Sequence, residues 1–230
     1  MSSVPARVGF ALLPVLLLSA CGSSPAPVAA PAPVHTRAAA PVRGALAVRT
    51  AARGVLKPAD FPGATSAKTQ HNPAGEASFY RCLGQKLPTY AARDYGRTFT
   101  LTDGTVVSSS TDVAPSAARA AADFALLQSP KSRACLKTLV AAAVSKNGSK
   151  VLGVTVEQKP ITVAGADKAL LSFMTITLTS HGRTGQVAIL DLAGLVGQSE
   201  VALEVVPRGT QLTVAGAANL LTAAVARVSG

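Results

Sequence analysis

The feature of the chain that most constrains its fold is a series of four strand-like segments between residues 151 and 206. Each segment is rich in β-branched and apolar residues and is separated from the next by a short turn. Strands in this arrangement pair with their sequence neighbours in antiparallel fashion. The series therefore predicts an antiparallel meander, built in chain order from VLGVTVEQ, KALLSFMTITLTS, TGQVAILDLAG and SEVALEVVP.

A second strand pair is predicted before the meander. Residues 97–101 and 105–113 have strand-like composition, and Asp103-Gly104 between them is a strong hairpin signal, because glycine tolerates positive φ. The whole pattern predicts an α+β fold, with an antiparallel sheet of about five to six strands packed against helices in an α/β sandwich.

Helices are predicted both before and after the meander in the sequence. A short helix is expected within 75–84, an alanine-rich helix opened by Ser116, and a third over 131–145 with Ser129 as its cap and Pro130 at its first turn. The last segment has apolar residues on one helical face, which predicts an amphipathic closing helix. These residues are Ala217, Leu220, Leu221, Ala224, Val225 and Val228.

The N-terminus has the features of a bacterial export signal. Arg7 precedes an apolar stretch over 10–18, and this stretch is too short to span a bilayer as a helix. Leu18-Ser19-Ala20-Cys21 resembles the lipobox of bacterial lipoproteins, which implies that Cys21 is lipidated and becomes the first mature residue. An ordinary secretory signal with a chance cysteine is the alternative. No later segment is predicted to span a membrane.

The sequence thus divides into a signal peptide (1–20), an Ala/Pro-rich basic tether (21–58) and one folded domain (59–230). The chain has 22 Lys+Arg and 11 Asp+Glu, and five of the cations lie in the tether, which has no acidic residue. They could bind anionic lipid or acidic wall polymers, or simply keep the tether soluble. Because the domain is only mildly basic, poor in aromatic residues and exported, nucleic acid is not expected as a partner.

Cys82 and Cys135 remain once Cys21 is assigned to the lipid. An exported protein meets oxidising conditions, so a Cys82–Cys135 disulfide is the natural pairing. The alternatives are a redox-active pair or a metal site. Redox cysteines usually lie close together in sequence, and two cysteines without a nearby histidine make a poor zinc site. No metal and no cofactor are expected.

Catalytic groups are hard to assemble from the sequence. The histidines His35, His71 and His181 fall in the tether, a loop and a hairpin tip, and none is close in sequence to the serines at 108–110. Known nucleophile, phosphate-binding and zinc-protease motifs are missing from the sequence. Glu200 and Glu204 are four residues apart, so their side chains would lie on the same face of a strand. They could form a paired-carboxylate acid/base site, but the favoured interpretation is a solvated outer face, and Asp167 and Asp191 look equally scattered.

A family resemblance rests on several short motifs. The arrangement of Asp60-Phe61-Pro62-Gly63, Cys82, the strand VVSSSTDV and the segment from Ser129-Pro130-Lys131 to Cys135 resembles actinobacterial lipoproteins with a PknH-type extracellular sensor domain. The wider LpqN-type lipoproteins, with a PsbP-like fold, are similar too. The resemblance implies extracellular sensing or binding rather than catalysis, and it supplies no catalytic residues.

The expected function is therefore a non-enzymatic binding or sensing module, held at the extracellular face of the cell membrane through Cys21. Its ligand would be a small molecule, a lipid or an envelope protein, bound in a cleft between the meander and the closing helix. A cell-envelope hydrolase and a structural wall-binding protein are the alternatives.

Overall fold

The computed structural model describes residues 41–69, 71–146, 149–180 and 182–230. The predicted signal peptide, Cys21 and His35 lie outside this part of the chain. The helices are α1 (Gly44–Gly54), α2 (Pro73–Cys82), α3 (Ala117–Leu127), α4 (Pro130–Lys146) and α5 (Val214–Ser229), with a 3-10 turn at Pro58–Asp60. The strands are β1 (Thr65–Lys68), β2 (Ala92–Tyr95), β3 (Arg97–Thr100), β4 (Val106–Val113), β5 (Lys150–Ile161), β6 (Lys168–Ser180), β7 (Arg183–Val196) and β8 (Ser199–Val206).

The fold is α+β, as predicted, and all strand pairs are antiparallel. The sheet order is β1-β3-β4-β8-β7-β6-β5, with β2 also paired to β4, so the predicted meander β5–β8 is confirmed. The β3–β4 hairpin is confirmed as well, and Gly104 in its turn has φ 82°. The sheet has eight strands rather than five to six. The two that sequence analysis missed, β1 and β2, have four residues each and lack apolar alternation.

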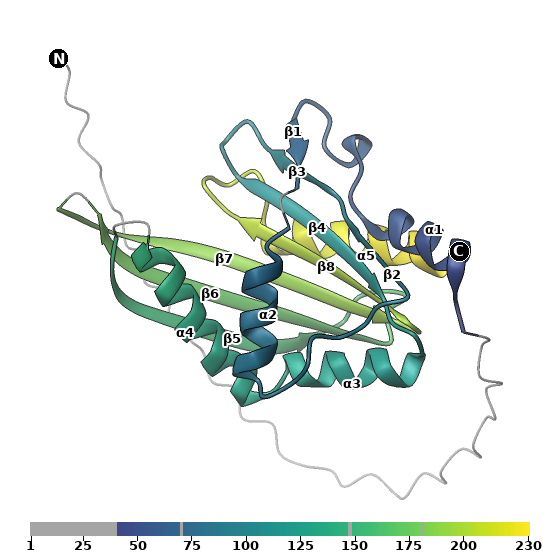
Figure 1. The fold of residues 1–230 in the computed structure, drawn as a ribbon. Coiled ribbons are helices and arrows are strands. Elements are labelled where there is room, and N and C mark those ends of the chain that lie inside the picture. Colours follow the sequence, from purple (N-terminus) through teal and green to yellow (C-terminus); the bar gives the residue numbers. More distant parts are fainter. Residues whose placement is uncertain (1–40, 70, 147–148, 181) are drawn as a thin grey trace, which may run out of the picture. The chain divides into compact units, whose positions relative to one another are not determined.

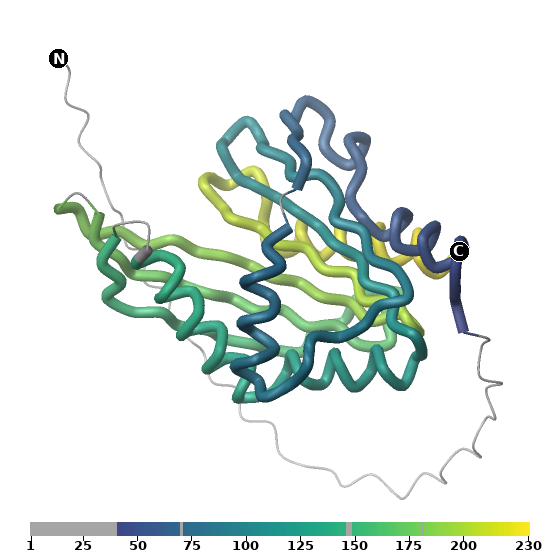
Figure 2. The backbone as a smooth tube through the Cα atoms, in the orientation of Figure 1, coloured from purple at the N-terminus to yellow at the C-terminus, as the bar shows by residue number. Residues whose placement is uncertain are grey.

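Helices cover both faces of this sheet (Figure 1). Helices α1 and α5 pack on one face, and α2, α3 and α4 lie over the other. Figure 2 shows that β6 and β7 run well past the ends of β4 and β8, in keeping with their lengths of 13 and 14 residues against 8. The result is a helix–sheet–helix sandwich.

Strand β8 shows why its two faces differ. Val201, Leu203 and Val205 are buried in the main core, which they share with the apolar face of α5. The intervening residues, Glu200, Ala202 and Glu204, point to the opposite face, because side chains alternate along a strand. The apolar stripe predicted for the closing helix is confirmed, and its buried members are Ala217, Leu221, Ala224 and Val225.

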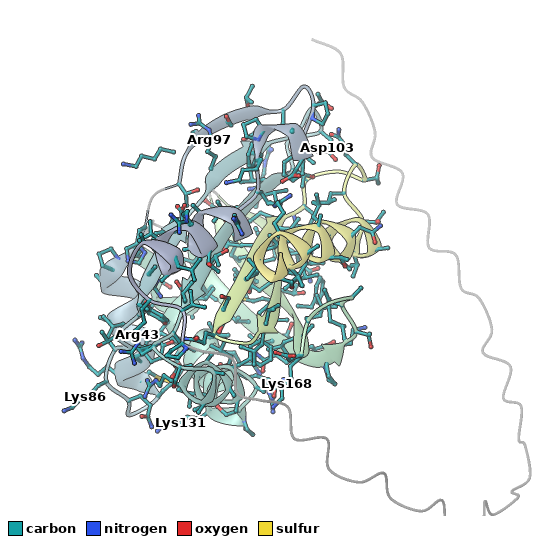
Figure 3. The ribbon with its side chains drawn as sticks, turned by 90° about the vertical axis from the view of Figure 1, so that its right-hand side faces the viewer. Arg43, Lys86, Arg97, Asp103, Lys131 and Lys168 are labelled. Carbon is teal, nitrogen blue, oxygen red and sulfur yellow. A yellow bond between two sulfur atoms is a disulfide. The ribbon has the colours of Figure 1, made fainter. Side chains whose placement is uncertain are left out.

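Helix α1 corrects the predicted tether and the domain boundary at residue 59. Ala47 and Ala51, one helical turn apart, are 0 % and 1 % exposed and pack with Val113 of β4. Figure 3 shows α1 beside α5, and Arg227 of α5 donates hydrogen bonds to both Asp60 carboxylate oxygens. The tether prediction failed over this segment because the buried residues of α1 are small or polar and give a weak hydrophobic signal; they are Ala47, Thr50, Ala51 and Gly54.

The new boundary also assigns most of the basic residues of the predicted tether to the folded domain. Of the five cations assigned to the tether, only Arg37 lies outside the described residues. Arg43, Arg49, Arg53 and Lys57 belong to the folded part of the chain. The sequence estimate of a mildly basic domain therefore understated its positive charge.

The predicted cysteine pairing is present in the structure. Cys82 at the end of α2 and Cys135 in α4 form a disulfide that links residues 53 apart in sequence. A loop of this length corresponds to about 4 kcal/mol of stabilisation in the chain-entropy model. The predicted caps are also observed, since the hydroxyls of Ser116 and Ser129 accept backbone N–H bonds from Arg119 and Ser132. Together the disulfide and the α4 cap hold α2 and α4 over the sheet.

Candidate functional site

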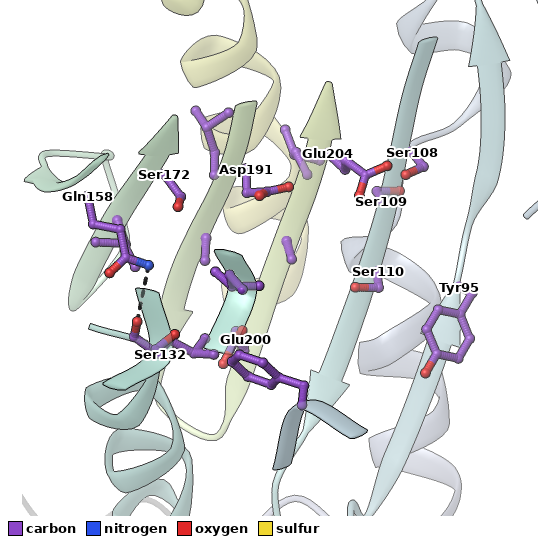
Figure 4. Close-up of a pocket in the computed structure, with 18 of the residues that line it drawn as sticks. Tyr95, Ser108, Ser109, Ser110, Ser132, Gln158, Ser172, Asp191, Glu200 and Glu204 are labelled. Carbon is purple, nitrogen blue, oxygen red and sulfur yellow. Dashed lines mark hydrogen bonds between the residues drawn. The ribbon is translucent and has the colours of Figure 1, made fainter. Parts of the chain in front are cut away.

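A cavity lies on the sheet face that α2, α3 and α4 cover. It has a volume of about 330 Å³, and strands β4, β6, β7 and β8 form its floor (Figure 4). Apolar walls come from Phe79 of α2, Leu127 of α3 and Leu136 of α4, and Tyr95 of β2 contributes to one side. This size and mixture of apolar walls with a few polar groups are typical of small-molecule sites.

A row of polar residues crosses the floor of this cavity. Residues paired across neighbouring strands lie on the same face of the sheet. Five strands each contribute one polar residue to a single row of such pairs. Asp191 and Glu204 are direct partners in this row, and Figure 4 shows them on neighbouring strands, with the Glu204 carboxylate directed toward Ser108. In sheet order the row reads Gln158, Ser172, Asp191, Glu204 and Ser108.

Two buried hydroxyls at the cavity have no hydrogen-bond partner among the described residues. Ser172 on β6 is 4 % exposed and Ser132 on α4 is 0 % exposed, and both line the cavity. A buried unpaired hydroxyl costs free energy, so such groups normally find a partner. Gln158 differs from them, because its Nε2 donates to the carbonyl of Leu127 at 3.2 Å and its Oε1 accepts from Arg133.

The carboxyl groups of the cavity resist ionisation because they are poorly hydrated. Burial and, to a lesser degree, the charge of Glu204 raise the pKa of Asp191 to about 7. Burial, with smaller contributions from Asp112 and Asp123, raises the pKa of Glu200 to about 8, although Arg93 opposes this shift. Partial desolvation by the surrounding walls raises the pKa of Glu204 too, although its side chain is exposed to the open part of the cavity.

Two arginines lie beside this site. Arg133 donates to Gln158 Oε1 and to the carbonyl of Gln128. Arg93 is held by carboxylates that do not line the cavity. It donates two hydrogen bonds to Glu76 at 2.7 and 2.8 Å and two to Asp112, while its guanidinium stacks on Tyr90 at 4.0 Å. Asp112 is the cross-strand partner of Glu200, so this network closes the Glu200 end of the cavity. Among the described residues that line the cavity, none is Lys, Arg or His.

The structure corrects the predicted location of the cleft. The space between the meander and α5 is filled by the main apolar core, which includes Leu192, Leu203 and Leu221. The cavity lies on the opposite face of the sheet. Sequence analysis could identify α5 as the closing helix, but it could not show that α2, α3 and α4 leave a gap over the other face.

The favoured interpretation of Glu200 and Glu204 as a solvated outer face is correct only in part, because Glu204 is exposed whereas Glu200 is half-buried. They share a face, as their spacing predicted, and this face lines the cavity. Asp191, which looked scattered in the sequence, joins them there. Asp167 does not, since it lies in the β5–β6 connection and accepts the N–H of Gly197, in the β7–β8 turn, at 2.7 Å.

The serines and histidines divide in the same way. Ser108 and Ser110 pair with residues of the cavity face, whereas the hydroxyl of Ser109 lies on the other face and accepts the Leu56 N–H. His71 stacks on Tyr95 with ring centroids 4.2 Å apart, and it is not a lining residue of the cavity. His181, like His35, lies outside the described residues.

Sequence analysis missed Ser132, Gln158 and Ser172 entirely. The available signal was the interruption of apolar strands by single polar residues, such as Asp191 within VAILDLAG and Ser172 within ALLSFM. Only the register shows that these interruptions align. The described residues contain no cluster of three or more His, Cys, Asp or Glu suited to holding a metal ion, and no described helix is long and apolar enough to cross a membrane.

Comparison with known proteins does not assign the chain to a family. No protein-family model matches it, and no curated protein sequence matches it.

Proposed function

We propose that the chain is a cell-envelope lipoprotein whose folded domain is a non-catalytic binding or sensing module for a small ligand. The observation that carries this proposal is the cavity of about 330 Å³, with apolar walls and two buried hydroxyls that lack partners. A ligand can satisfy such groups and cover the apolar walls at the same time. The resemblance to sensor-domain lipoproteins supports the same function.

The proposal favours binding over turnover because of how the serines are bonded. In the described part of the chain, no hydrogen bond joins a cavity serine to an imidazole or a carboxylate, which is the contact that activates a serine nucleophile. An envelope hydrolase remains the second candidate. The paired Asp191 and Glu204, with raised pKa values, favour it, because such carboxyls suit general acid/base chemistry.

Cavity filling tests the binding function. The lipoprotein, extracted from its own envelope in mild detergent, is expected to retain a small molecule that mass spectrometry detects after denaturation. Ala202→Phe places a ring on the cavity floor and should reduce the retained amount at least tenfold. Ala188→Phe, on the opposite face of the neighbouring strand, should retain it fully.

Equal retention by both variants would show that the ligand binds elsewhere. If the unmodified protein retains nothing but hydrolyses members of an ester, peptide or glycoside panel, and Asp191→Asn abolishes that hydrolysis, the second candidate replaces the first.

Membrane attachment through Cys21 has its own test. We expect mass spectrometry of the membrane fraction to find a diacylglyceryl group on an N-terminal Cys21 peptide. Two acyl chains anchor stably where one does not, so Cys21→Ala should move the protein out of the membrane fraction. Ser23→Ala, two residues away, should leave it attached. Complete membrane partitioning of Cys21→Ala would contradict lipid anchoring at this residue.

A further inference from the structure

The electrostatic character of the cavity is opposite to that of the chain around it. The protein has twice as many basic as acidic residues, yet three carboxylic acids and no basic side chain line the described cavity. The nearby Arg93 is held by Glu76 and Asp112, and Arg133 at the edge of the cavity donates to Gln158 and to the carbonyl of Gln128. Among the described residues, no cation is therefore paired with the cavity carboxyls.

A buried hydroxyl also indicates a ligand that donates hydrogen bonds, independently of the carboxyl groups. Ser172 is the direct cross-strand partner of Asp191, and its oxygen has no partner in the described structure. A hydroxyl oxygen can accept an N–H bond, and a neighbouring carboxylate can accept two more. Ser172, Asp191 and Glu204 thus form a continuous line of acceptors along the register of β6, β7 and β8.

Apolar walls limit what kind of cation could bind. Phe79, Leu127, Leu136 and Leu170 line the cavity, and they offer nothing to a hydrated metal ion. An organic cation instead places its charged end on the acceptors and its hydrocarbon against these side chains. Moving the ammonium and carboxylate charges out of water costs little only when they are paired and hydrogen-bonded to each other. An ammonium group can achieve this here, because it has several N–H donors.

We propose that the cavity binds a small protonated primary or secondary amine with an apolar body, with the ammonium group on Asp191, Glu204 and Ser172. This inference rests on the proposed binding function and specifies the chemical class of its ligand. Neutral alcohols and carboxylates of the same shape bind more weakly, because the first leaves the acids without a cation and the second adds like charge.

Three probes of matched shape test the ligand class: 2-phenylethylammonium, 2-phenylethanol and 3-phenylpropanoate. Calorimetric titration of the full-length protein in detergent at pH 8 should give at least tenfold tighter binding of the amine than of either other probe. Asp191→Asn and Glu204→Gln should each weaken amine binding at least tenfold while leaving the alcohol unchanged. Asp191→Asn removes a poorly hydrated carboxyl and Glu204→Gln replaces an exposed one with a group of the same shape, so neither is expected to impair folding.

Glu157→Gln is the matched control, because Glu157 is exposed and lies next to Gln158 on the opposite face of β5. Its amine affinity should equal that of the unmodified protein. Tighter binding of the alcohol or the carboxylate, or equal amine binding by Asp191→Asn, overturns the cationic ligand while leaving the binding function in place. Failure of all three probes, together with no loss of retained ligand in Ala202→Phe, overturns both.

Discussion

Leu221→Asp is expected to unfold the domain at neutral pH. Leu221 is 0 % exposed, and it packs in the main core with Leu192 and Leu203 from the sheet. The substitution removes a buried apolar side chain, leaves a cavity and places a carboxylate where no partner exists. The first two effects cost about 3–5 kcal/mol in comparable cores, and the buried carboxyl adds several more. The sum is comparable with the whole stability of a typical domain.

Urea denaturation followed by circular dichroism measures this effect. Val214→Asp is the matched control, because Val214 starts the same helix, is 49 % exposed and lies where a negative charge favours the helix dipole. We expect its unfolding midpoint to equal or slightly exceed that of the unmodified protein. A cooperative transition near the normal midpoint for Leu221→Asp would show that α5 does not close the core.

The second large effect is a loss of stability as pH rises. The folded-state pKa values of Asp191 and Glu200, about 7 and about 8, lie above their ordinary values of 3.8 and 4.5. The folded state therefore binds more protons than the unfolded state between about pH 4 and pH 8. The stabilisation is fully present below the unfolded pKa values and is lost as pH rises through the folded ones.

We expect the free energy of unfolding to fall by about 3 kcal/mol between pH 5 and pH 8.5, with allowance for solvent access to the cavity. The melting temperature should fall with it. Glu200→Gln and Asp191→Asn should each flatten the profile by raising stability at pH 8.5. Arg93, Asp112 and Asp123 also act on Glu200, and they are unchanged in both variants, so the difference between profiles reports the substituted group.

Glu157→Gln, on the exposed side of β5, serves as the reference for removing a carboxylate from the surface. Its profile should parallel that of the unmodified protein. A profile of Glu200→Gln that falls as steeply as that of the unmodified protein would show that Glu200 is well hydrated, and the cavity would then not be the poorly solvated site described above.

Features that depend on a few neighbouring residues could be predicted from the sequence. The meander, the β3–β4 turn at Gly104, the caps at Ser116 and Ser129 and the apolar stripe of α5 all follow from local periodicity and backbone preference. The Cys82–Cys135 pairing also followed, because only two cysteines remained to pair. None of these predictions required knowledge of which segments meet in space.

Helix α1 marks the limit of that reasoning. Ala47 and Ala51 carry little hydrophobic signal, and their burial depends on a flat surface supplied by β4 and α5, far along the chain. The need for glycine at position 54 also comes from tertiary packing, because a Cβ there would lie 2.3 Å from Thr111 Oγ1 on β4. Composition alone made this segment look like the proline-rich residues before it.

The candidate site, in contrast, depends on how distant segments pack together. Ser108 and Gln158 come from opposite ends of the polar row, and the register of four strand pairs brings them into line with Asp191 and Glu204. Whether that face meets water or protein depends on α2, α3 and α4, which cover it without filling it. Which side chains of a strand share a face follows from their spacing in the sequence, because side chains alternate between the two faces. The hydration of a carboxyl group, in contrast, depends on every element packed around it.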